Sequence, residues 1–330
     1  MVEERMARFL SDTGPGAGLY GMMRYHLGWV DESFLPVKAD GGKRVRARLC
    51  LLACQAAGGL PEQAISPAAA VELVHNFSLI HDDIQDRSEY RRHRSTVWSV
   101  WGAPQAINAG DGMFTAAQLA LAEDEGTDPA TRVQGFQTLN HASRMLCEGQ
   151  YLDLDFERRV RVSVDEYLSM IERKTASLLA TACYLGALYG GAGAETRSRY
   201  REFGLQMGMA FQMQDDHLGN WGDPKVTGKP AADDVVNKKK TLPLVYSLEA
   251  ATPQDRKTLL DILSRPGLAS PEETSLVLDI MARCGAPEHT AREVARLSDL
   301  ALAALQEASP HDPAGAEMAA LVRRLVVRTN

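Results

Sequence analysis

The chain has 330 residues, of which 45% are hydrophobic and 6% aromatic, and its formal net charge at pH 7 is −7. A chain of this length buries a large core as one or two domains, and its negative charge argues against a general nucleic-acid-binding surface, which would be basic. It contains no 18-residue uncharged apolar span of the kind that forms a transmembrane helix.

The first predicted elements are helices over residues 3–11 and 19–27, separated by the breaker Gly14-Pro15-Gly16. A turn at Asp40-Gly41-Gly42 precedes an apolar helix that runs to about Ala57. The start of this helix is rich in cations: Lys43, Arg44, Arg46 and Arg48. Because cations at a helix N-terminus oppose the helix dipole, four of them there indicate an anion site more than a solvated helix start.

Residues 71–86, VELVHNFSLIHDDIQD, predict an amphipathic helix because apolar and acidic positions recur at three- and four-residue intervals. The helix face that these positions form is apolar at its N-terminal end and acidic at its C-terminal end. Asp82 and Asp86 are one turn apart, about 5 to 6 Å between Cβ atoms, with Asp83 beside them. An acidic helix end is often simply solvated, but three carboxylates converging beyond an apolar face indicate a cation site. Oxygen ligands of this kind suit Mg²⁺, which takes one or two carboxylates plus substrate phosphates.

The residues directly after this helix, 87–94, are a loop dense in cations, RSEYRRHR. A salt-bridged surface loop is the ordinary interpretation. Arginine, however, is the residue suited to bidentate phosphate binding. The acidic and basic clusters together predict a metal-bridged polyphosphate held from both sides.

Further helices are predicted over 105–123, 134–153 and 167–188, the last of which holds Lys174 and Thr175. A single lysine in such a helix ordinarily snorkels to solvent. Residues 202–216 then repeat the pattern of 71–86, because a Met-rich apolar face ends in FQMQDD at 211–216.

A helix break is predicted at 219–224, GNWGDP, followed by a polar, lysine-containing loop over 225–240 and an apolar helix over 242–250. The lysines of this loop are either solvated charges or part of a lid over phosphate. The remainder is predicted to be helical. With no fixed-period repeat, low-complexity tract or interdomain linker, we expect a single all-α domain over 1–330.

Five cysteines are an odd number, and most lie in apolar helical patterns: Cys50, Cys54, Cys147, Cys183 and Cys284. This favours reduced, buried thiols in a cytoplasmic protein. Cys50 and Cys54 lack the partners of a zinc set, and residues 1–35 show no secretory signal.

Two aspartate-rich motifs preceded by Gly-Gly-Lys-Arg resemble the trans (E-type) isoprenyl diphosphate synthases, the polyprenyl synthetase family. The blocks that match, in the expected order, are GGKRVR at 41–46, HNFSLIHDDIQD at 75–86, RR at 91–92, GQYLDL at 149–154, KTASLL at 174–179, FQMQDD at 211–216, and GK at 228–229 followed by KKKTLP at 238–243. The resemblance implies an all-α isoprenoid synthase fold, with helices around a deep central active-site cavity, usually as a homodimer.

The resemblance also assigns roles to residues of this chain. It implies Mg²⁺ as cofactor, three ions, with metal ligands Asp82, Asp86 and Asp215 and with Asp83 and Asp216 beside them. It places the allylic diphosphate on Arg91, Lys174 and Lys229, assisted by Lys239. It places isopentenyl diphosphate on Lys43, Arg46, His75 and Arg92. Thr175 and Gln212 are then expected to stabilise a carbocation.

The implied reaction is Mg²⁺-dependent chain elongation. Cleavage of the carbon–oxygen bond of an allylic diphosphate gives a carbocation and pyrophosphate, so Mg²⁺, Arg and Lys lower the barrier by stabilising the developing anion. The double bond of isopentenyl diphosphate attacks the cation, and a proton leaves. A closing lid would exclude water from the cation.

Three other classes remain as alternatives. A terpene cyclase would need the metal cluster but not a second diphosphate site. A phosphohydrolase of the HD type would use His75, His81 and Asp82, but it does not explain the second aspartate pair. A non-catalytic partner subunit is suggested only by Gly219, which stands where the second motif normally has a third Asp.

Other departures from the family pattern are His93 and Ser95, which replace a Gly and a Pro. Asp223 is a candidate to replace the missing third Asp in part.

Product length is expected to depend on the fourth and fifth residues before Asp82, which are Ser78 and Phe77. Phe77 lies about 7.5 Å up the helix at 1.5 Å per residue. One aromatic at the fifth position resembles enzymes that make geranylgeranyl diphosphate (C20). At 100° per residue Phe77 lies about 140° around the helix from Asp82. Its ring therefore need not face the cavity that Asp82 faces, and farnesyl diphosphate (C15) is the alternative product.

Overall fold

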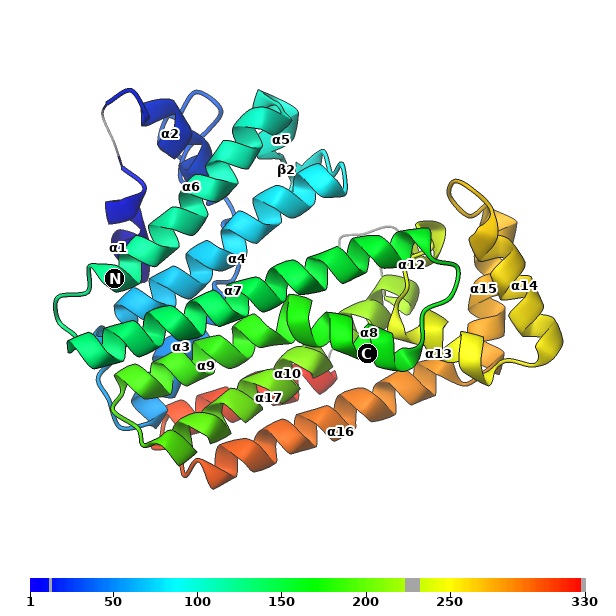
Figure 1. Ribbon diagram of the computed structural model, residues 1–330. Coiled ribbons are helices and arrows are strands. Elements are labelled where there is room, and N and C mark those ends of the chain that lie inside the picture. The colour runs from blue at the N-terminus through cyan, green and yellow to red at the C-terminus, as the bar shows by residue number, and fades with distance from the viewer. Residues whose placement is uncertain (12–13, 223–231, 328–330) are drawn as a thin grey trace. The chain divides into compact units, whose positions relative to one another are not determined.

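The structure is a computed structural model that describes residues 1–11, 14–222 and 232–327. It confirms the all-α prediction, because helices make up nearly every element of the described residues (Figure 1). The exception is one antiparallel pair of two-residue strands, β1 (Tyr90–Arg91) and β2 (Arg94–Ser95).

By its internal contacts the chain groups into two compact units. Unit 1 comprises residues 1–143, 181–198 and 310–315; unit 2 comprises 144–180, 199–309 and 316–330. Whether 1–330 is a single domain stays a prediction.

Unit 1 is built around α4 (Ile65–Gln85), which lies along α6 (Ala103–Ala122) (Figure 1). Its other elements are α1 (Val2–Phe9), α2 (Ala17–His26), α3 (Val45–Ala56), the 3₁₀ turn η1 (Pro61–Ala64), α5 (Val97–Trp101) and the start of α7 (Pro129–Arg158). Gly110 of α6 packs against the ring of His81, so the two helices approach closely because no Cβ intervenes. This contact helps to hold the acidic end of α4.

Unit 2 contains the rest of α7 and a series of further helices. They are α8 (Val164–Ile171), the π-helical turn η2 (Glu172–Ala176), α9 (Ser177–Tyr189), α10 (Ala194–Trp221), α12 (Asp233–Val236), α13 (Leu242–Ala250), α14 (Pro253–Ser264), α15 (Pro271–Arg283), α16 (Ala286–Glu307) and α17 (Ala314–Val327). Helices α9, α10 and α17 also have residues in unit 1. The Oγ atoms of Ser163, Thr252 and Ser270 each accept the backbone N–H of the residue three positions on, which fixes where α8, α14 and α15 begin.

The core of unit 2 includes Phe156, Tyr167, Met213 and Leu242, all at most 2% exposed. The Met-rich face predicted over 202–216 therefore packs into the core.

The helix break predicted over 219–224 contains the observed end of α10 at Trp221, although Gly219 itself is still helical. Two hydrogen bonds hold the last turn of α10: Asn220 Nδ2 donates to the carbonyl of Asp216 at 2.8 Å, and the Gly222 N–H donates to the carbonyl of Leu218 at 2.8 Å. A glycine is accommodated there because the Asp234 carboxylate takes the space that a Cβ would need.

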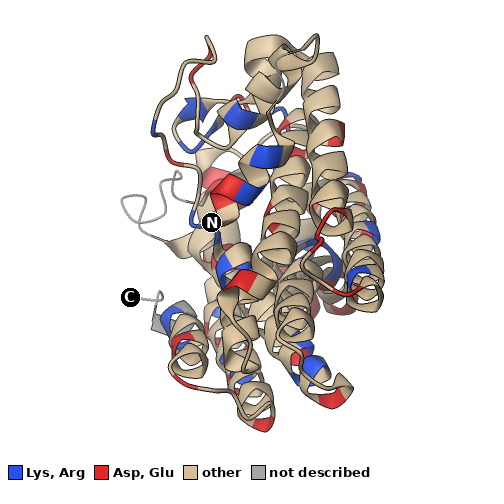
Figure 2. Ribbon diagram, turned by 90° about the vertical axis from the view of Figure 1, so that its left-hand side faces the viewer, with Lys and Arg blue, Asp and Glu red and all other residues tan. Residues whose placement is uncertain are grey.

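Basic and acidic residues are interspersed along the ribbon and do not separate into a basic and an acidic part (Figure 2). No helix among the described residues is long and apolar enough to cross a membrane.

Candidate functional site

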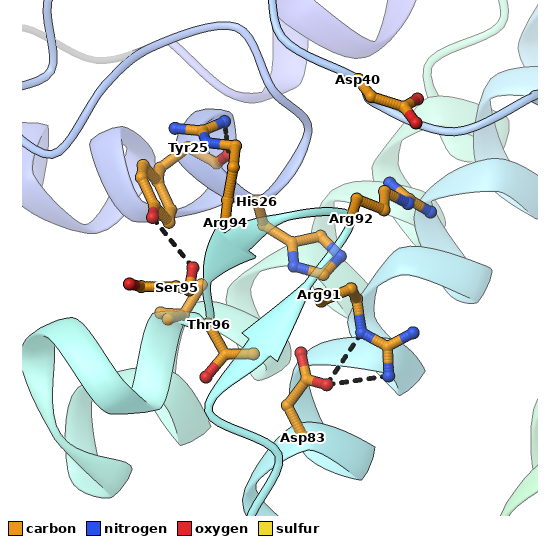
Figure 3. A pocket seen from close by; sticks show the side chains of 10 residues that line it. Tyr25, His26, Asp40, Asp83, Arg91, Arg92, Arg94, Ser95 and Thr96 are labelled. Carbon is orange, nitrogen blue, oxygen red and sulfur yellow. Dashed lines mark hydrogen bonds and ion pairs between the residues drawn. The ribbon is translucent and has the colours of Figure 1, made fainter. Parts of the chain in front are cut away.

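The acidic end of α4 in unit 1 divides its three aspartates between two environments. Asp82 is half-buried and Asp86 is exposed, one helical turn apart as predicted. Asp83 is 1% exposed, and its Oδ1 accepts a hydrogen bond from Arg91 Nε and lies 2.8 Å from Arg91 Nη2 (Figure 3). Convergence of all three carboxylates is therefore not observed, because successive residues point about 100° apart on a helix. Burial raises the pKa of Asp83 to about 6, although Arg91 opposes the rise.

The hairpin β1–β2 lies against the Gly41-Gly42 turn. Its own turn is tight, with Arg92 and His93 at φ of 52° and 61°. Arg92 Nη1 donates to the Gly41 carbonyl, and a Cβ on Gly42 would come within 2.7 Å of the Arg92 guanidinium. Gly42 itself has φ of 90°, which favours glycine. The glycine pair thus lets an arginine lie directly on the backbone that precedes α3.

A buried acid, Glu72 of α4, lies under the start of α3. It is 2% exposed, accepts the Ala47 N–H through Oε2 at 3.3 Å, and places Oε1 3.6 Å from Arg44 Nη1. Sequence reasoning did not single out Glu72. A lone glutamate inside the apolar run VELV was the available signal.

His75 lies close to two of the arginines that were predicted to bind isopentenyl diphosphate, Arg46 and Arg92. Burial, followed by the neighbouring Arg46 and Arg92 charges, lowers the pKa of His75 well below its ordinary value. Burial likewise lowers the pKa values of Arg46 and Arg92. The structure therefore brings together three of the four residues assigned to isopentenyl diphosphate, whereas the fourth, Lys43, is exposed.

His26, at the end of α2, was missed by sequence reasoning. It lines a pocket with Asp83, Arg91 and Arg92 (Figure 3). Burial and the adjacent guanidinium groups lower its pKa well below the ordinary value. A single histidine at a helix end carries no sequence signal of such a position.

Phe77, the proposed determinant of product length, faces α6. Its ring centroid lies 5.0 Å from that of Phe114 and 5.8 Å from that of His81. Phe77 is 8% exposed, and the neighbouring Ser78 is also buried, with its Oγ donating to the His75 carbonyl. Phe77 and Phe114 thus form an aromatic pair that the sequence did not reveal.

In unit 2, Lys174 and Thr175 lie in the π-helical turn η2, an element often found at functional sites. Gly149 of α7 packs against the Lys174 backbone, where a Cβ would clash. Lys174 Nζ contacts Asp153 Oδ2 at 2.5 Å, and Thr175 Oγ1 donates to Gln212 Oε1 at 2.8 Å. The predicted pair Thr175 and Gln212 is therefore in direct contact.

The second aspartate pair, at the end of α10, divides like the first. Asp215 is exposed, whereas Asp216 is 6% exposed. Asp216 accepts from Tyr167 Oη at 2.6 Å, Gln212 Nε2 at 3.0 Å and the Leu242 N–H at 3.0 Å. Burial raises its pKa to about 7 against the effect of these donors. Asp216 thus ties α8, α10 and α13 together.

A pocket of unit 2 gathers charged side chains, among them Asp153, Lys174, Asp215, Asp234 and Lys239. Asp234 and Asp153 were not predicted. Lys229 and Asp223 lie outside the described residues. Within the described ranges, no three His, Cys, Asp or Glu side chains converge as a ready-made metal site.

Comparison with known proteins gives a consistent result. A family model described as Polyprenyl synthetase matches residues 28–281. The (2E,6E)-farnesyl diphosphate synthase of Mycobacterium tuberculosis is 44% identical over 227 residues, which cover 69% of this chain and 62% of the relative. The geranylgeranyl diphosphate synthase of the same organism is 43% identical over 235 residues, covering 70% and 67%. The match thus spans less than two thirds of the length of the first relative.

Two solved structures share the fold over nearly the whole chain. A polyprenyl synthetase from Streptomyces coelicolor has a TM-score of 0.89 at 38% identity and covers 98% of this chain and 95% of its own. A geranylgeranyl pyrophosphate synthase from Corynebacterium glutamicum, complexed with isoprenyl diphosphate and magnesium, has a TM-score of 0.85 at 27% identity, covering 99% and 97%. The chain belongs to the polyprenyl synthetase family.

Proposed function

We propose that this protein is a Mg²⁺-dependent short-chain trans-prenyltransferase, which joins isopentenyl diphosphate to an allylic diphosphate. The observation that carries the proposal is the arrangement in unit 1. There the acidic end of α4, with Asp82 and Asp86, adjoins a cluster of Arg46, His75 and Arg92. A chain elongation enzyme needs both a metal-binding and a metal-free diphosphate site.

The α4 end fits Mg²⁺. This ion keeps several water ligands and takes one or two carboxylates plus phosphate oxygens. Asp82 and Asp86 supply that number at helical spacing, and Asp215 is the exposed carboxylate of the second motif. When bound, Mg²⁺ supplies positive charge that offsets the negative charge of the leaving pyrophosphate. The number of ions, three by family resemblance, stays a prediction.

The residues of unit 2 suit the ionisation step. Lys174, with Lys239 and Lys229, is proposed to hold the allylic diphosphate, while Asp153 orients the Lys174 ammonium. The Thr175 hydroxyl donates to Gln212 Oε1, which leaves the lone pairs of Thr175 Oγ1 and the second lone pair of Gln212 Oε1 to stabilise a carbocation. Asp216 positions Gln212 by accepting a hydrogen bond from Gln212 Nε2.

The residues of unit 1 suit the second substrate. Arg46, His75 and Arg92, with the exposed Lys43, are proposed to hold isopentenyl diphosphate. Arg91 is proposed to reach the allylic diphosphate, oriented by Asp83. The double bond attacks the carbocation, and the proton then lost goes to a pyrophosphate oxygen, so no side-chain nucleophile is required.

We propose geranylgeranyl diphosphate (C20) as the main product. Phe77 is buried against Phe114, and the two rings supply a bulky apolar stop on α4 and α6. Farnesyl diphosphate (C15) remains a second candidate, since a farnesyl diphosphate synthase is as similar to the chain as a geranylgeranyl diphosphate synthase.

The deciding experiment is product analysis with each allylic primer in turn. Purified protein with Mg²⁺, isopentenyl diphosphate and farnesyl diphosphate is expected to release pyrophosphate and form a C20 diphosphate. No reaction with farnesyl diphosphate, together with C15 formation from shorter primers, would establish the farnesyl alternative. A hydrocarbon formed without consumption of isopentenyl diphosphate would identify a cyclase.

Phe77→Ala tests the chain-length proposal separately. The product is expected to lengthen by at least one five-carbon unit because the stop on α4 is removed. Ser78→Ala changes the other position expected to affect product length and should leave the product unchanged, because serine and alanine are both small. An unchanged product from Phe77→Ala would remove this residue from the determination of length.

We also propose a homodimer. Four large apolar side chains of α6 and α7 in unit 1 are exposed by 40–56%: Ile107, Leu119, Val133 and Phe136. Exposed apolar side chains on neighbouring helices are typical of a protein–protein interface. Light scattering coupled to gel filtration should give twice the 36.0 kDa chain mass, and a monomeric mass would contradict the proposal.

A further inference from the structure

Several buried nitrogen atoms near the start of α3 have no hydrogen-bond partner among the residues that the structure describes. They are His26 Nε2, Arg46 Nε and two nitrogens of Arg44; those of Arg44 lie 3.6 Å from the carboxylates of Glu3 and Glu72, which leaves His26 and Arg46 to be explained. Buried polar groups are almost always hydrogen-bonded, and a group that is not calls for an explanation such as a bound ligand. Arginine nitrogens have only hydrogens to offer, so the ligand that satisfies this group must be rich in acceptor oxygens.

His26 lies where such a ligand would meet several cations at once. Its ring lines the same pocket as Arg91 and Arg92, and Figure 3 shows it directed toward the side of the pocket where these two arginines lie. Arg44 is close enough to lower its pKa as well. The acids nearby are engaged in part: Asp83 contacts Arg91 through Oδ1, and Asp40 accepts the Gly42 N–H. Two buried oxygens near His26, Asp83 Oδ2 and Asn76 Oδ1, have no hydrogen-bond partner among the described residues, and the imidazole and guanidinium donors around the pocket outnumber them.

Two residues of α4 lie near His26: Asn76, whose side chain raises the pKa of His26 through a hydrogen bond, and His75, one of the residues proposed to hold isopentenyl diphosphate. A charge on His26 would lower the pKa of His75, and Arg92 lowers the pKa of both rings. A neutral imidazole in this position supplies a directional N–H without adding another positive charge to a crowded group of guanidinium ions. Arg46 and Arg92, by contrast, bring a positive charge with every N–H that they donate.

We infer that His26 is a further substrate-binding residue, whose Nε2–H donates a hydrogen bond to an oxygen of the isopentenyl diphosphate beside Arg92 and His75. The inference rests on the proposed function, because it names an additional contact in the same site. It differs from the residues expected by resemblance, since His26 precedes the first matching block and lies on α2.

The test is binding of isopentenyl diphosphate alone, measured calorimetrically in EDTA so that metal-dependent sites do not contribute. His26→Leu removes the donor and is expected to weaken binding about tenfold or more, as for a hydrogen bond to a charged group. His26→Gln restores an N–H and should bind within about threefold of the unmodified protein. His93→Leu, an exposed histidine of the nearby hairpin, is the matched control and should have no effect.

Turnover gives an independent readout. His26→Leu should raise KM for isopentenyl diphosphate about tenfold, with kcat and the KM for the allylic substrate nearly unchanged. Equal affinity of His26→Leu and the unmodified protein would overturn the inference. A general loss of kcat without a change in KM would do the same.

A measurement on the unmodified protein covers the case in which His26→Leu does not fold. In ¹⁵N-histidine-labelled protein, with the resonance assigned from His26→Gln, the His26 Nε2 signal should shift on addition of isopentenyl diphosphate. An unmoved signal in a protein that binds this ligand overturns the inference and leaves the proposed function standing. Failure of the unmodified protein to bind the ligand overturns both.

Discussion

The ends of α4 and α10 carry the same Asp-Asp pair, and each pair separates into one accessible and one buried acid. Asp82 and Asp215 come first in their pairs and are half-buried and exposed, whereas Asp83 and Asp216 are buried. The buried acids differ in their partners. Asp83 pairs with a guanidinium on a surface hairpin, but Asp216 accepts three neutral donors from the core. The second Asp of the pair thus forms an ion pair in unit 1, whereas in unit 2 it joins three helices through hydrogen bonds.

The two motifs also differ at the residue that stands four positions after the first Asp. In unit 1 it is the exposed Asp86, but in unit 2 it is Gly219, against which the Asp234 carboxylate packs. An acid from α12 therefore occupies the space beside the position where the family pattern has an acid on α10. The ends of α4 and α10 are therefore alike in sequence but differ in the partners of their acidic side chains.

The largest expected effect comes from the accessible acid of α4. Asp82→Ala should lower kcat by about 10³-fold or more, because it removes a proposed ligand of the charge that stabilises the leaving group. Asp215→Ala should have a smaller effect, since the first motif stays complete. Steady-state rates with circular dichroism as a folding control will decide. Retained activity in Asp82→Ala would contradict the metal assignment.

Asp216→Ala is expected to be the most destabilising change at either end. It leaves the Tyr167 hydroxyl, the Gln212 amide and the Leu242 N–H without an acceptor, and each unsatisfied buried group costs about 1–3 kcal/mol. The free energy of unfolding in urea should fall by about 3 kcal/mol. A loss below about 1 kcal/mol would mean that water replaces the carboxylate and that Asp216 is not a junction of the core.

Gly219→Ala tests the packing of Asp234. The new Cβ meets the carboxylate, so overpacking of about 1–3 kcal/mol should exceed the gain in helix propensity of about 1 kcal/mol. Gly18→Ala is the matched control, because Gly18 of α2 has open space around its Cα and should gain about 0.5–1 kcal/mol. If both variants are stabilised, the Asp234 side chain moves away freely and the packing argument fails.

Sequence reasoning predicted the elements well and the pairings poorly, for a physical reason. The helical period of 71–86 and 202–216 is local, so both motif helices were found where the structure has them. The start of α4 at Ile65 was missed, and the predicted break over 219–224 did not indicate that Gly219 is still helical and packs against Asp234. Local pattern carries no information about such a contact.

The unpredicted site residues are those whose role depends on partners far away in the chain. Glu72 meets Ala47 at a distance of 25 residues, and His26 lines a pocket with Arg91 and Arg92. Neither belongs to a block with a recognisable spacing. By contrast, Thr175 and Gln212 were expected through family blocks, and the structure places them in contact across 37 residues.

The smallest expected effect is that of Asp83→Ala, which sharpens the contrast with Asp216. The side chain of Arg91 is 31% exposed, so water can solvate the guanidinium once its partner is gone. The loss in the free energy of unfolding should be about 1 kcal/mol or less at pH 8, against about 3 kcal/mol for Asp216→Ala.

This small loss should grow as the pH falls. Burial raises the pKa of Asp83 from 3.8 to about 6, so between these values the folded protein binds a proton that the unfolded chain does not. The contribution of Asp83 to stability is therefore fully present below about pH 4 and is lost as the pH rises through 6. Urea unfolding in EDTA at pH 8 and pH 5 should show a larger difference between the two proteins at pH 5. A difference that shrinks on acidification would mean that the Arg91 ion pair outweighs burial, and that Asp83 contributes mainly as a charged partner.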